Sequence, residues 1–263
     1  MSEPRTANAR TLVVIATYNE RENLRPLVEA ILGLGLPGLD VLVVDDASPD
    51  GTGELADELA GEHPQVQVLH RAGKQGLGSA VLAGMARAQE GGYDYVATMD
   101  ADFSHPPRYL PDLLARREEA DVVVGSRYVP GGGARDWGLA RRAMSWGANA
   151  FARLLLGLRA RDCSGNYRCY RTERVGRIDP RSILAAGYAF QEEMLYRCQL
   201  LGARVVEVPI VFEDRRRGET KMSLGEVWGL LATVLRLRWR RLTGRLASPG
   251  PGRGPDGPAG EET

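Results

Sequence analysis

The sequence predicts an α/β fold in which helices flank a mostly parallel β-sheet. Short apolar runs alternate with helical patterns of about 11 to 15 residues, which is the order that βαβ units produce. The apolar runs are nearly continuous, as expected for strands that are covered by helices on both faces. A chain of 263 residues suits one such domain with a small addition.

The first half of the chain supplies most of the expected sheet. Strands are expected at residues 11–16, 40–45, 66–70, 95–99 and 121–125. Helices are expected between and after them, at residues 20–34, 51–61, 76–90 and 107–119. A turn with Ser, Pro, Asp and Gly precedes the second helix, and glycines open the third.

The second half has longer helical patterns. Helices are expected at residues 140–158, 190–201 and 223–242, strands at 167–170 and 204–212, and a polar loop at 214–222. The Pro/Gly-rich composition near the C-terminus predicts a disordered tail over residues 247–263. We therefore expect a flexible N-terminus over 1–10, an α/β domain over 11–222 and an amphipathic helix over 223–246.

The composition excludes several classes of protein. Lys and Arg together number 34, as do Asp and Glu, and this balance argues against general nucleic-acid binding. The 3 cysteines form no Cys-x-x-Cys pair, which favours a reduced, cytosolic compartment. The first ten residues lack the apolar core of a signal peptide. No stretch approaches the length of about 18 apolar residues that a membrane-spanning helix needs.

The most informative motif is Asp100-Ala101-Asp102, at the end of the fourth predicted strand. Residues i and i+2 of a strand point to the same side, so the two carboxylates can meet at one cation. A divalent ion that is held by one or two carboxylates keeps positions open for phosphate oxygens. Asp-x-Asp also occurs in turns and helix caps, but the residues at the neighbouring strand ends favour a metal and diphosphate site.

Polar side chains also follow the other predicted strands. Residues 16–20 (Ala-Thr-Tyr-Asn-Glu) follow the first strand, and residues 126–128 (Ser-Arg-Tyr) follow the fifth. Ligands bind outside the carboxyl ends of the strands in open α/β sheets, so we expect a nucleotide site at this edge. Asp46, after the second strand, is a candidate acceptor for base or ribose donors, and Tyr18 can stack on a base.

Several of these residues have a structural alternative. Thr17 or Asn19 can cap the following helix, and Asp45 and Asp46 can open the next turn. The segment 74–78 (Lys-Gln-Gly-Leu-Gly) is similar to a phosphate-binding loop but lacks the Walker A pattern. Its alternative is a glycine-rich helix start that packs tightly.

Basic residues are concentrated in the second half of the chain. They include Arg127, Arg135, Arg141, Arg142, Arg168 and the run 215–217. Arginine forks match phosphate oxygens in bidentate fashion, so the polar loop with Arg215 and Lys221 is a candidate phosphate clamp; a solvated loop is the alternative. Glu192 and Glu193 at a helix start complement the helix dipole, which is a structural reason for one of them.

The last predicted helix combines apolar and basic residues. It carries Trp228, Trp239 and several leucines, and five arginines lie between residues 236 and 245. No acidic residue occurs from 227 to 255. This composition is typical of a helix that lies in a membrane interface. The alternative is a helix packed on the core with a basic outer face.

Taken in order, these motifs resemble the family 2 glycosyltransferases with the GT-A fold, and within them the dolichol- or polyprenol-phosphate mannose synthases. The matching segments are residues 16–20, 44–52, 74–78, 100–107, 125–128, 137–141, 147–149, 162–168, 190–194 and 215–221. The resemblance therefore covers roughly residues 11–223. It implies that residues 11–222 form a GT-A (Rossmann-like) catalytic domain, followed by the interfacial helix.

The resemblance also implies roles for individual residues. The residues implied to bind the nucleotide sugar are Ala16, Tyr18, Glu20, Asp46, Lys74, Asp100, Ala101 and Asp102. Asp100 and Asp102 would also hold Mg²⁺ or Mn²⁺. Acceptor-phosphate binding falls to Arg127, Arg141, Arg215 and Lys221. Roles in catalysis fall to Asp102, Arg127, Gln191 and Glu193. The chain departs from the family at Ala16 (usually Pro), Thr220 (usually Ser) and Ser104, where some members have a metal-binding Gln.

The implied reaction is the inverting transfer of mannose from GDP-mannose to a polyprenyl or dolichyl monophosphate. The acceptor phosphate, with a second pKa of about 6, is already anionic at pH 7. A strong general base is therefore unnecessary, and His63, His70 and His105 are expected to be turn or packing residues. The enzyme is expected as a peripheral protein on the cytoplasmic face of the membrane. A fused or separate subunit that anchors it is compatible with the lack of a membrane span.

Three rival functions remain at this point. The first is a polyprenyl-phosphate glucosyltransferase of the same fold that uses UDP-glucose. The second is a nucleotidyltransferase, which would carry a Gly/Arg/Lys signature after the first strand, where residues 17–20 have none. The third is a non-catalytic, membrane-associated nucleotide-binding subunit. A panel of donor sugars separates the first of these from mannosyl transfer, and turnover of any donor excludes the last.

Overall fold

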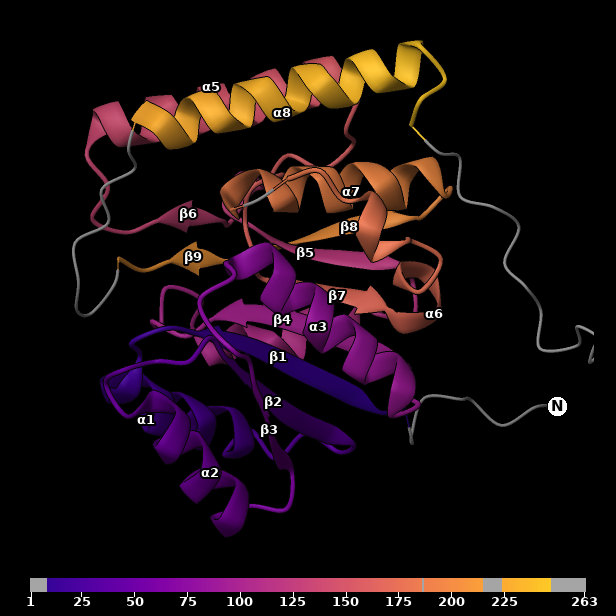
Figure 1. Ribbon diagram of the computed structural model, residues 1–263. Helices are drawn as coiled ribbons and strands as arrows, with labels where there is room; N and C mark the ends of the chain where they lie inside the picture. The colour runs from indigo at the N-terminus through magenta and orange to yellow at the C-terminus, as the bar shows by residue number, and fades with distance from the viewer. Residues whose placement is uncertain (1–8, 186, 215–223, 247–263) are drawn as a thin grey trace, which may run out of the picture.

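A seven-stranded sheet lies at the centre of the computed structural model, which describes residues 9–185, 187–214 and 224–246 (Figure 1). The strands are β1 (Thr11–Thr17), β2 (Leu39–Asp45), β3 (Val66–His70), β4 (Tyr95–Asp100), β5 (Val122–Ser126), β6 (Gly133–Ala134), β7 (Arg168–Arg171), β8 (Val205–Pro209) and β9 (Val211–Phe212). The α-helices are α1 (Arg21–Leu32), α2 (Thr52–Glu62), α3 (Leu77–Glu90), α4 (Leu110–Ala115), α5 (Leu139–Leu156), α6 (Thr172–Val175), α7 (Phe190–Leu200) and α8 (Leu224–Leu242). Short 3₁₀ helices are η1 (Pro107–Tyr109), η2 (Pro180–Ser182) and η3 (Gly187–Ala189).

The strand order of the main sheet is β3-β2-β1-β4-β7-β5-β8. All neighbours are parallel except β7, which runs antiparallel to both β4 and β5. The predicted α/β class with a mostly parallel sheet is therefore confirmed. From β1 the chain proceeds to β2 and β3 on one side and then returns to β4 on the other. In open α/β sheets ligands bind outside the carboxyl ends of the strands at such a switch, and here Ala16 pairs with Asp100.

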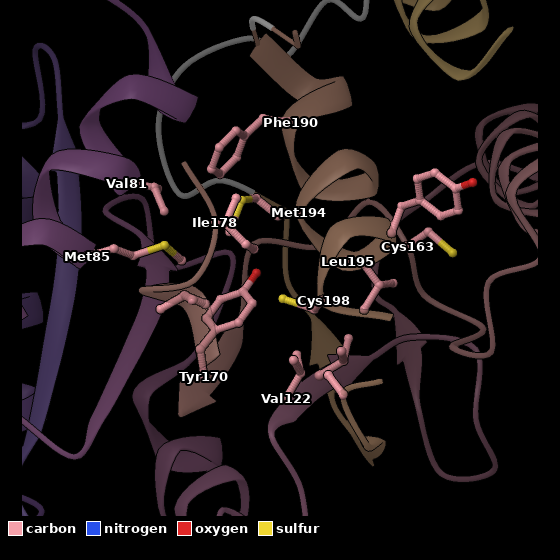
Figure 2. Packing of buried hydrophobic residues seen from close by; sticks show 14 of the residues in the cluster. Val81, Met85, Val122, Cys163, Tyr170, Ile178, Phe190, Met194, Leu195 and Cys198 are labelled. Carbon is pink, nitrogen blue, oxygen red and sulfur yellow. The ribbon is translucent and has the colours of Figure 1, made fainter. Parts of the chain in front are cut away.

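Helices cover both faces of this sheet, so each strand contributes to two apolar clusters. In β1, Leu12 and Val14 face the cluster formed with α3, α5, α7 and α8. Val13 and Ile15 face the cluster formed with α1, α2 and α4. Figure 2 shows part of the first cluster, where the Phe190 ring of α7 lies between its own helix and α3. Burial on both faces explains why the strand sequences are apolar almost throughout.

Helix α3 packs very closely on the sheet because it carries glycines at its contact points. A Cβ atom on Gly84 would lie 2.4 Å from a methyl carbon of Val14, and one on Gly78 would lie 2.8 Å from the ring of Phe190. Gly76 precedes the helix with a φ of 91°, a conformation that favours glycine. The structural alternative for the segment 74–78, a tightly packed helix start, is therefore confirmed.

Two predicted elements differ from the structure. The helix expected at 107–119 consists of η1 and α4 and ends at Ala115. The charged residues 116–119 that follow have no apolar side chain to bury, so nothing supports a longer helix. The strand expected at 204–212 divides after Pro209, where the Ile210 N–H still donates to Ser126 of β5 but the Ile210 carbonyl oxygen accepts from Gly133. Its second part, β9, pairs instead with the unexpected short strand β6.

Helices α5 and α8 lie side by side along one edge of the molecule (Figure 1). The expected helix at 223–242 corresponds to α8, which buries Leu230, Val234 and Leu237 in the first cluster. Within the part of the chain that the structure describes, no helix has the length and apolarity needed to cross a membrane. The flexible N-terminus and the disordered tail were predicted for segments that lie largely or wholly outside the described residues.

Candidate active site

Asp100 and Asp102 lie at the carboxyl edge of the sheet. Asp100 is the last residue of β4, whereas Asp102 lies in the following turn, so the expected strand geometry for both is wrong. The chain leaves the strand here because Phe103 adopts a positive φ of 62° and Asp102 Oδ1 accepts the Ser104 N–H at 3.0 Å. Asp102 and Ala101 are buried, while the Asp100 side chain remains 29% exposed. The turn thus buries one carboxylate and leaves the other partly exposed to solvent.

The donor atoms around this turn suit a hard divalent cation. The Ser104 hydroxyl oxygen is buried and has no hydrogen-bond partner among the described residues. Carboxylate and hydroxyl oxygens are the ligands that Mg²⁺ and Mn²⁺ prefer. The described residues include no group of three or more His, Cys, Asp or Glu that would enclose a metal. Asp100, Asp102 and Ser104 could hold a divalent cation, and a cation bound by so few protein atoms keeps positions for phosphate oxygens.

His105 supports the turn as a neutral ring. Burial lowers its pKa, against the opposing effect of the Asp100 and Asp102 charges. Its Nδ1 accepts the Asp100 N–H at 3.3 Å, so the proton of the neutral ring lies on Nε2. The ring packs against Tyr167 and Phe212, with centroid distances of 5.2 and 5.4 Å. The prediction that His105 is a packing residue is therefore confirmed.

Residues expected to bind the nucleotide lie around the ends of β1 and β3. The Lys74 ammonium sits 3.9 Å from the centroid of the Tyr18 ring, so two segments distant in sequence meet here. Glu20 precedes α1, and its carboxylate accepts a hydrogen bond from Asn23 at 2.8 Å. Ala16 lies beside Asp100 in the β1–β4 pairing. These residues therefore gather at the switch point, as the strand-end rule predicted.

Asp46 has a structural role that the sequence did not reveal. Its Oδ2 accepts the backbone N–H groups of Gln75 and Gly76 at 2.9 and 3.1 Å. The Arg71 Nη1 atom lies 3.0 Å from Oδ1, close enough for charge attraction although the two atoms are not aligned as a hydrogen bond. Asp46 thus fixes the loop before α3 beside β2. Its contact with a nucleotide stays a prediction.

Asp45 opens the turn after β2, as its structural alternative held, whereas Thr17 does not cap the helix that follows it. Asp45 accepts hydrogen bonds from the Ser48 hydroxyl at 2.5 Å and the Ser48 N–H at 3.0 Å, which builds the turn. The Thr17 hydroxyl donates to Asp45 at 3.1 Å and to a neighbouring carbonyl. Neither Thr17 nor Asn19 caps helix α1; the N–H of its first residue, Arg21, donates instead to the Asp50 carboxylate at 3.2 Å. Asn19 instead takes a positive φ of 61°.

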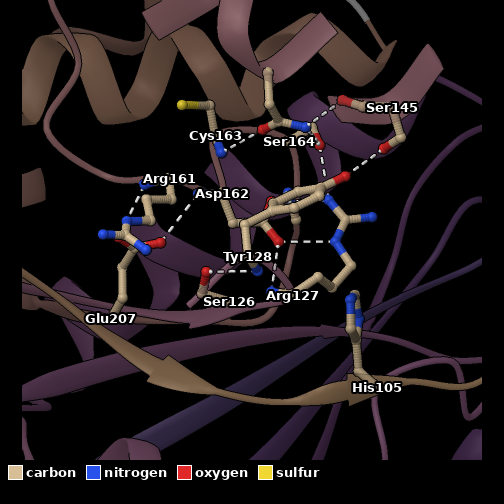
Figure 3. Close-up of polar contacts among 12 residues, drawn as sticks. His105, Ser126, Arg127, Tyr128, Ser145, Arg161, Asp162, Cys163, Ser164 and Glu207 are labelled. Atoms are coloured by element: carbon tan, nitrogen blue, oxygen red, sulfur yellow. Dashed lines mark hydrogen bonds and ion pairs between the residues drawn. The ribbon is translucent and has the colours of Figure 1, made fainter. Parts of the chain in front are cut away.

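Arg127, after β5, forms a bidentate ion pair with Asp162 (Figure 3). Its Nε and Nη2 donate to the two carboxylate oxygens at 2.7 Å each, and Nη2 also donates to Ser164 at 2.8 Å. Burial alone would raise the pKa of Asp162, but the charge and hydrogen bonds of Arg127 hold it below its ordinary value. The fork that was expected to meet a phosphate is therefore bound to Asp162. Nη1 makes none of these bonds.

Trp137 brings Arg127 and Arg141 to one aromatic surface. The guanidinium carbons of Arg141 and Arg127 lie 4.4 and 5.5 Å from the Trp137 ring, which also packs edge-on against Phe212 at 5.4 Å. Arg141 forms an ion pair with Asp214 at 2.9 Å and remains partly exposed. Trp137 had no assigned role in the sequence. Because the β6–β9 pair places Phe212 beside it, only the folded chain reveals this arrangement.

Gln191 and Glu193 are both buried at the start of α7. Gln191 Nε2 donates to Asn166 Oδ1 at 2.6 Å. Glu193 accepts the backbone N–H groups of residues 184–185 at 2.9 and 2.8 Å, and Arg197 Nη2 lies 2.7 Å from its other oxygen. The Glu193 carboxylate thus supports a loop, and its role in catalysis stays a prediction.

Arg168, one of the basic residues in the second half of the chain, has a structural role. It is fully buried between β7 and α7, and it donates to the carbonyl oxygens of Gln191 at 2.7 Å and Cys163 at 2.5 Å. Two further expected phosphate ligands, Arg215 and Lys221, lie outside the described residues.

Asp162 and Asn166 contact the expected site residues but had no assigned role. Both belong to the matching segment 162–168. A buried arginine needs a carboxylate partner, and this rule would have pointed to Asp162 had the burial of Arg127 been visible from the sequence.

The model of glycosyl transferase family 2 matches residues 12–178, which is more than half of the chain. The chain belongs to glycosyl transferase family 2. It is a glycosyltransferase, as the resemblance of its motifs implied.

Two relatives and one solved structure extend this assignment. This glycosyltransferase is 48% identical over 246 residues to the undecaprenyl-phosphate mannosyltransferase of Micrococcus luteus, a match that covers 90% of this chain and 99% of that protein. It is 45% identical over 240 residues to the polyprenol monophosphomannose synthase of Mycolicibacterium smegmatis, covering 87% and 90%. The glucosyl-3-phosphoglycerate synthase of Mycobacterium tuberculosis, solved with Mn²⁺, UDP-glucose and phosphoglyceric acid, has a TM-score of 0.66 at 19% identity, covering 89% and 81%. That likeness concerns the fold alone and confirms the predicted GT-A arrangement.

Proposed function

We propose that this glycosyltransferase transfers mannose from GDP-mannose to a polyprenyl monophosphate and forms polyprenyl-phosphate β-mannose. The observation that carries the proposal is the 48% identity to an undecaprenyl-phosphate mannosyltransferase over 99% of that protein. The position of Asp100 and Asp102 at the switch point supports a donor with a diphosphate. The choice of GDP and the inverting course rest on the resemblance of the sequence motifs.

Asp100 and Asp102 would hold Mg²⁺ or Mn²⁺ together with the donor diphosphate. When bound, such a cation offsets the negative charge of the diphosphate leaving group. Tyr18 and Lys74 would meet the nucleoside, because they form one surface beside the end of β1. The Mn²⁺ in the glucosyl-3-phosphoglycerate synthase structure belongs to that protein and supports the cation here through the shared fold.

The acceptor phosphate would attack as an anion. With a second pKa of about 6 it is largely dianionic at pH 7, so the step needs no proton acceptor from the protein. The phosphate oxygen would bond to the anomeric carbon while the bond from that carbon to the donor diphosphate breaks, and this single displacement inverts an α-linked donor to a β-linked product. Arg141, Arg215, Lys221 and Nη1 of Arg127 would hold the acceptor against repulsion between the phosphates. Gln191 would lie on the side of the sugar.

The lipid of the acceptor would enter from a membrane surface along α5 and α8. Exposed apolar side chains on the two helices support this orientation; they are Leu139, Met144, Trp146 and Leu154 on α5, and Leu235, Trp239 and Leu242 on α8. The arginines of α8 would attract the anionic lipid surface. We place the enzyme as a peripheral protein on the cytoplasmic face.

Transfer assays with labelled sugars test this function. Purified protein, polyprenyl phosphate and Mg²⁺ should give a lipid-linked product from GDP-mannose, and EDTA should abolish it. Asp102→Asn should lose this activity, whereas Asp57→Asn, on the exposed surface of α2, should retain it. A lipid product from UDP-glucose but not from GDP-mannose would support the glucosyltransferase instead. Nucleotide binding without turnover of any donor would support a non-catalytic subunit.

A further inference from the structure

A row of hydrogen bonds joins Asp100 to the start of α7 through Asn166. Asn166 Nδ2 donates to Asp100 Oδ1 at 2.8 Å, and Gln191 Nε2 donates to Asn166 Oδ1 at 2.6 Å. The backbone oxygen of Asn166 accepts the Thr98 hydroxyl at 2.6 Å, which ties the same residue to β4. Asn166 and Gln191 are both buried, so water does not compete for these bonds.

The charge of Asp100 determines the direction of this row. An ionised carboxylate only accepts hydrogen bonds, so Asn166 must present Nδ2 to Asp100 and Oδ1 to Gln191. Gln191 must then present Nε2 to Asn166. Its Oε1 is left buried without a hydrogen-bond partner among the described residues. Because the ionised Asp100 carboxylate can only accept hydrogen bonds, it determines the amide orientations of both Asn166 and Gln191.

The far end of the row is anchored through the backbone. Arg168, which is fully buried, donates to the carbonyl oxygen of Gln191 at 2.7 Å and to that of Cys163 at 2.5 Å. The main chain of Gln191 is thus attached to β7, and its side chain to Asn166. Because the backbone of Gln191 is held in place, a substitution of its side chain should alter the orientation of Asn166 and not the position of α7.

We propose that Asn166 is a positioning residue that couples the cation-binding carboxylate of Asp100 to the amide of Gln191. This inference rests on the proposed function, because it takes Asp100 to be a cation ligand. The bond from Asn166 limits rotation of the Asp100 carboxylate, and the bond from Gln191 limits rotation of Asn166. Groups that hydrogen-bond a ligating carboxylate orient it for the metal. Cation affinity at Asp100 then depends on Gln191, which would contact the sugar side of the site.

Calorimetric titration with Mn²⁺ tests the coupling without any turnover. Asn166→Leu should weaken Mn²⁺ binding about tenfold, as loss of such a supporting bond does elsewhere. Gln191→Leu should weaken it about threefold. The double variant should bind no more weakly than Asn166→Leu alone, because Gln191 acts through Asn166. Gln199→Leu, on the same helix, is the matched control; its side chain bonds to backbone atoms of residues 157 and 159, so its Mn²⁺ affinity should be unchanged.

Asp100→Asn separates failure of the inference from failure of the proposed site. If Asp100→Asn abolishes Mn²⁺ binding while Asn166→Leu and Gln191→Leu bind as the wild type does, the coupling is overturned and the metal site stands. If the wild type binds no Mn²⁺, the metal site and the coupling are both overturned. Losses that simply multiply in the double variant also contradict the coupling. Should circular dichroism show that Asn166→Leu is unfolded, Asn166→Ala replaces it.

Discussion

Arg127 and Asp162 form a buried, bidentate ion pair whose two N–O distances are both 2.7 Å. Asp162 also accepts the backbone N–H groups of Arg127 and Gly165, at 3.0 and 3.1 Å. The pair therefore holds the turn after β5 against the segment before β7. Around the guanidinium lie the rings of Tyr128, Trp137 and Phe212, 5.4, 5.5 and 5.6 Å away. Through these contacts the ion pair organises the part of the candidate site that we propose to bind the acceptor.

Removing the charge of Asp162 should destabilise the fold strongly. Asp162→Asn keeps the size of the side chain but leaves the buried guanidinium without its counter-charge, which costs about 3–5 kcal/mol in comparable cases. Urea unfolding at pH 7 measures the change. Asp179→Asn, in the exposed pair with Arg181, is the control and should leave the midpoint unchanged. Similar shifts in both variants would contradict a special role for the buried pair.

The same ion pair predicts a pH dependence. Because Arg127 lowers the pKa of Asp162 in the folded protein, the folded state binds fewer protons at this site than the unfolded chain does. The stabilisation that ionised Asp162 gives the folded state is present above the ordinary carboxyl pKa of about 3.9 and is lost as the pH falls below it. The difference in stability between the wild type and Asp162→Asn should therefore shrink as the pH falls below about 4.

Glu192 should make the free energy of unfolding decrease as the pH rises, which is opposite to the effect of Asp162. It is buried beside Gln191, and burial raises its pKa to about 8 despite the nearby charge of Arg168. In the unfolded chain its pKa is about 4.3, so between these values the folded state binds the additional proton. Stability from this group therefore falls as the pH rises from about 4.3 towards 8 and is level above that. Glu192→Gln should remove this slope and stabilise the protein at pH 8 by up to about 5 kcal/mol, since one pKa unit corresponds to about 1.4 kcal/mol.

Urea unfolding at several pH values measures the Glu192 effect. The informative quantity is the difference between the wild type and Glu192→Gln at pH 5, where both side chains are neutral in the fold, and at pH 9. Stability curves that run parallel across this range would show that the folded protein tolerates an ionised Glu192.

The three cysteines should be inert in the folded enzyme. All are buried, and burial raises the pKa of Cys169 and Cys198 to about 12 and that of Cys163 further. The thiolate is the reactive form, and it is nearly absent at pH 8 with such pKa values. Ellman's reagent should therefore label no thiol in the native protein and all three in urea. Rapid labelling of one thiol in the native state would show local opening near that residue.

Sequence patterns predicted the elements that depend on contiguous residues. The strands between residues 11 and 126 were placed within a residue or two, because each is a buried apolar run with a turn at its end. Strand β6 was missed because Gly133 and Ala134 become a strand only through pairing with β9. Likewise, the antiparallel direction of β7 follows from where the chain returns to the sheet, which local periodicity does not record.

The sequence predicted the positions of those site residues that strand order alone brings together. Asp100, Ala16 and Tyr18 follow neighbouring strands, so the strand-end rule brings them together. The ion-pair partners of charged residues were harder to predict from the sequence. Asp162 lies 35 positions beyond Arg127, and nothing local shows that Arg127 is buried and needs a carboxylate. The same limit applies to Glu193 and Arg168, two charged residues whose buried hydrogen bonds the sequence did not reveal.

Helix α8 carries two apolar rows with different surroundings. Leu230, Val234 and Leu237 are buried in the core, whereas Leu235, Trp239 and Leu242 are more than half exposed. The helix packs on the core, as one interpretation of the sequence held, and the membrane interface stays a prediction that the exposed row allows. Deleting the whole helix would remove core residues together with the exposed row, so its effect on membrane binding would be uninterpretable. Substitutions in the exposed row alone avoid this difficulty.

Trp239→Ser combined with Leu242→Ser should weaken binding to vesicles that contain anionic lipid. Each side chain contributes roughly 1.5–3 kcal/mol when its apolar surface leaves water, so the pair should lower vesicle affinity by at least about tenfold. Flotation or sedimentation with vesicles of phosphatidylcholine and phosphatidylglycerol measures this. The free energy of unfolding in solution should change little, because both side chains are exposed in the fold.

Leu237→Ala provides the matched control on the same helix. It creates a cavity in the first core cluster and should cost about 2–5 kcal/mol of stability, while the folded fraction should bind vesicles as the wild type does. If instead the exposed-row variant binds vesicles normally, the membrane surface lies elsewhere and the exposed residues of α8 have another partner. If both variants bind weakly in proportion to their loss of stability, the effect reports folding rather than contact with lipid. Only a selective loss in the exposed-row variant supports α8 as a membrane-facing helix.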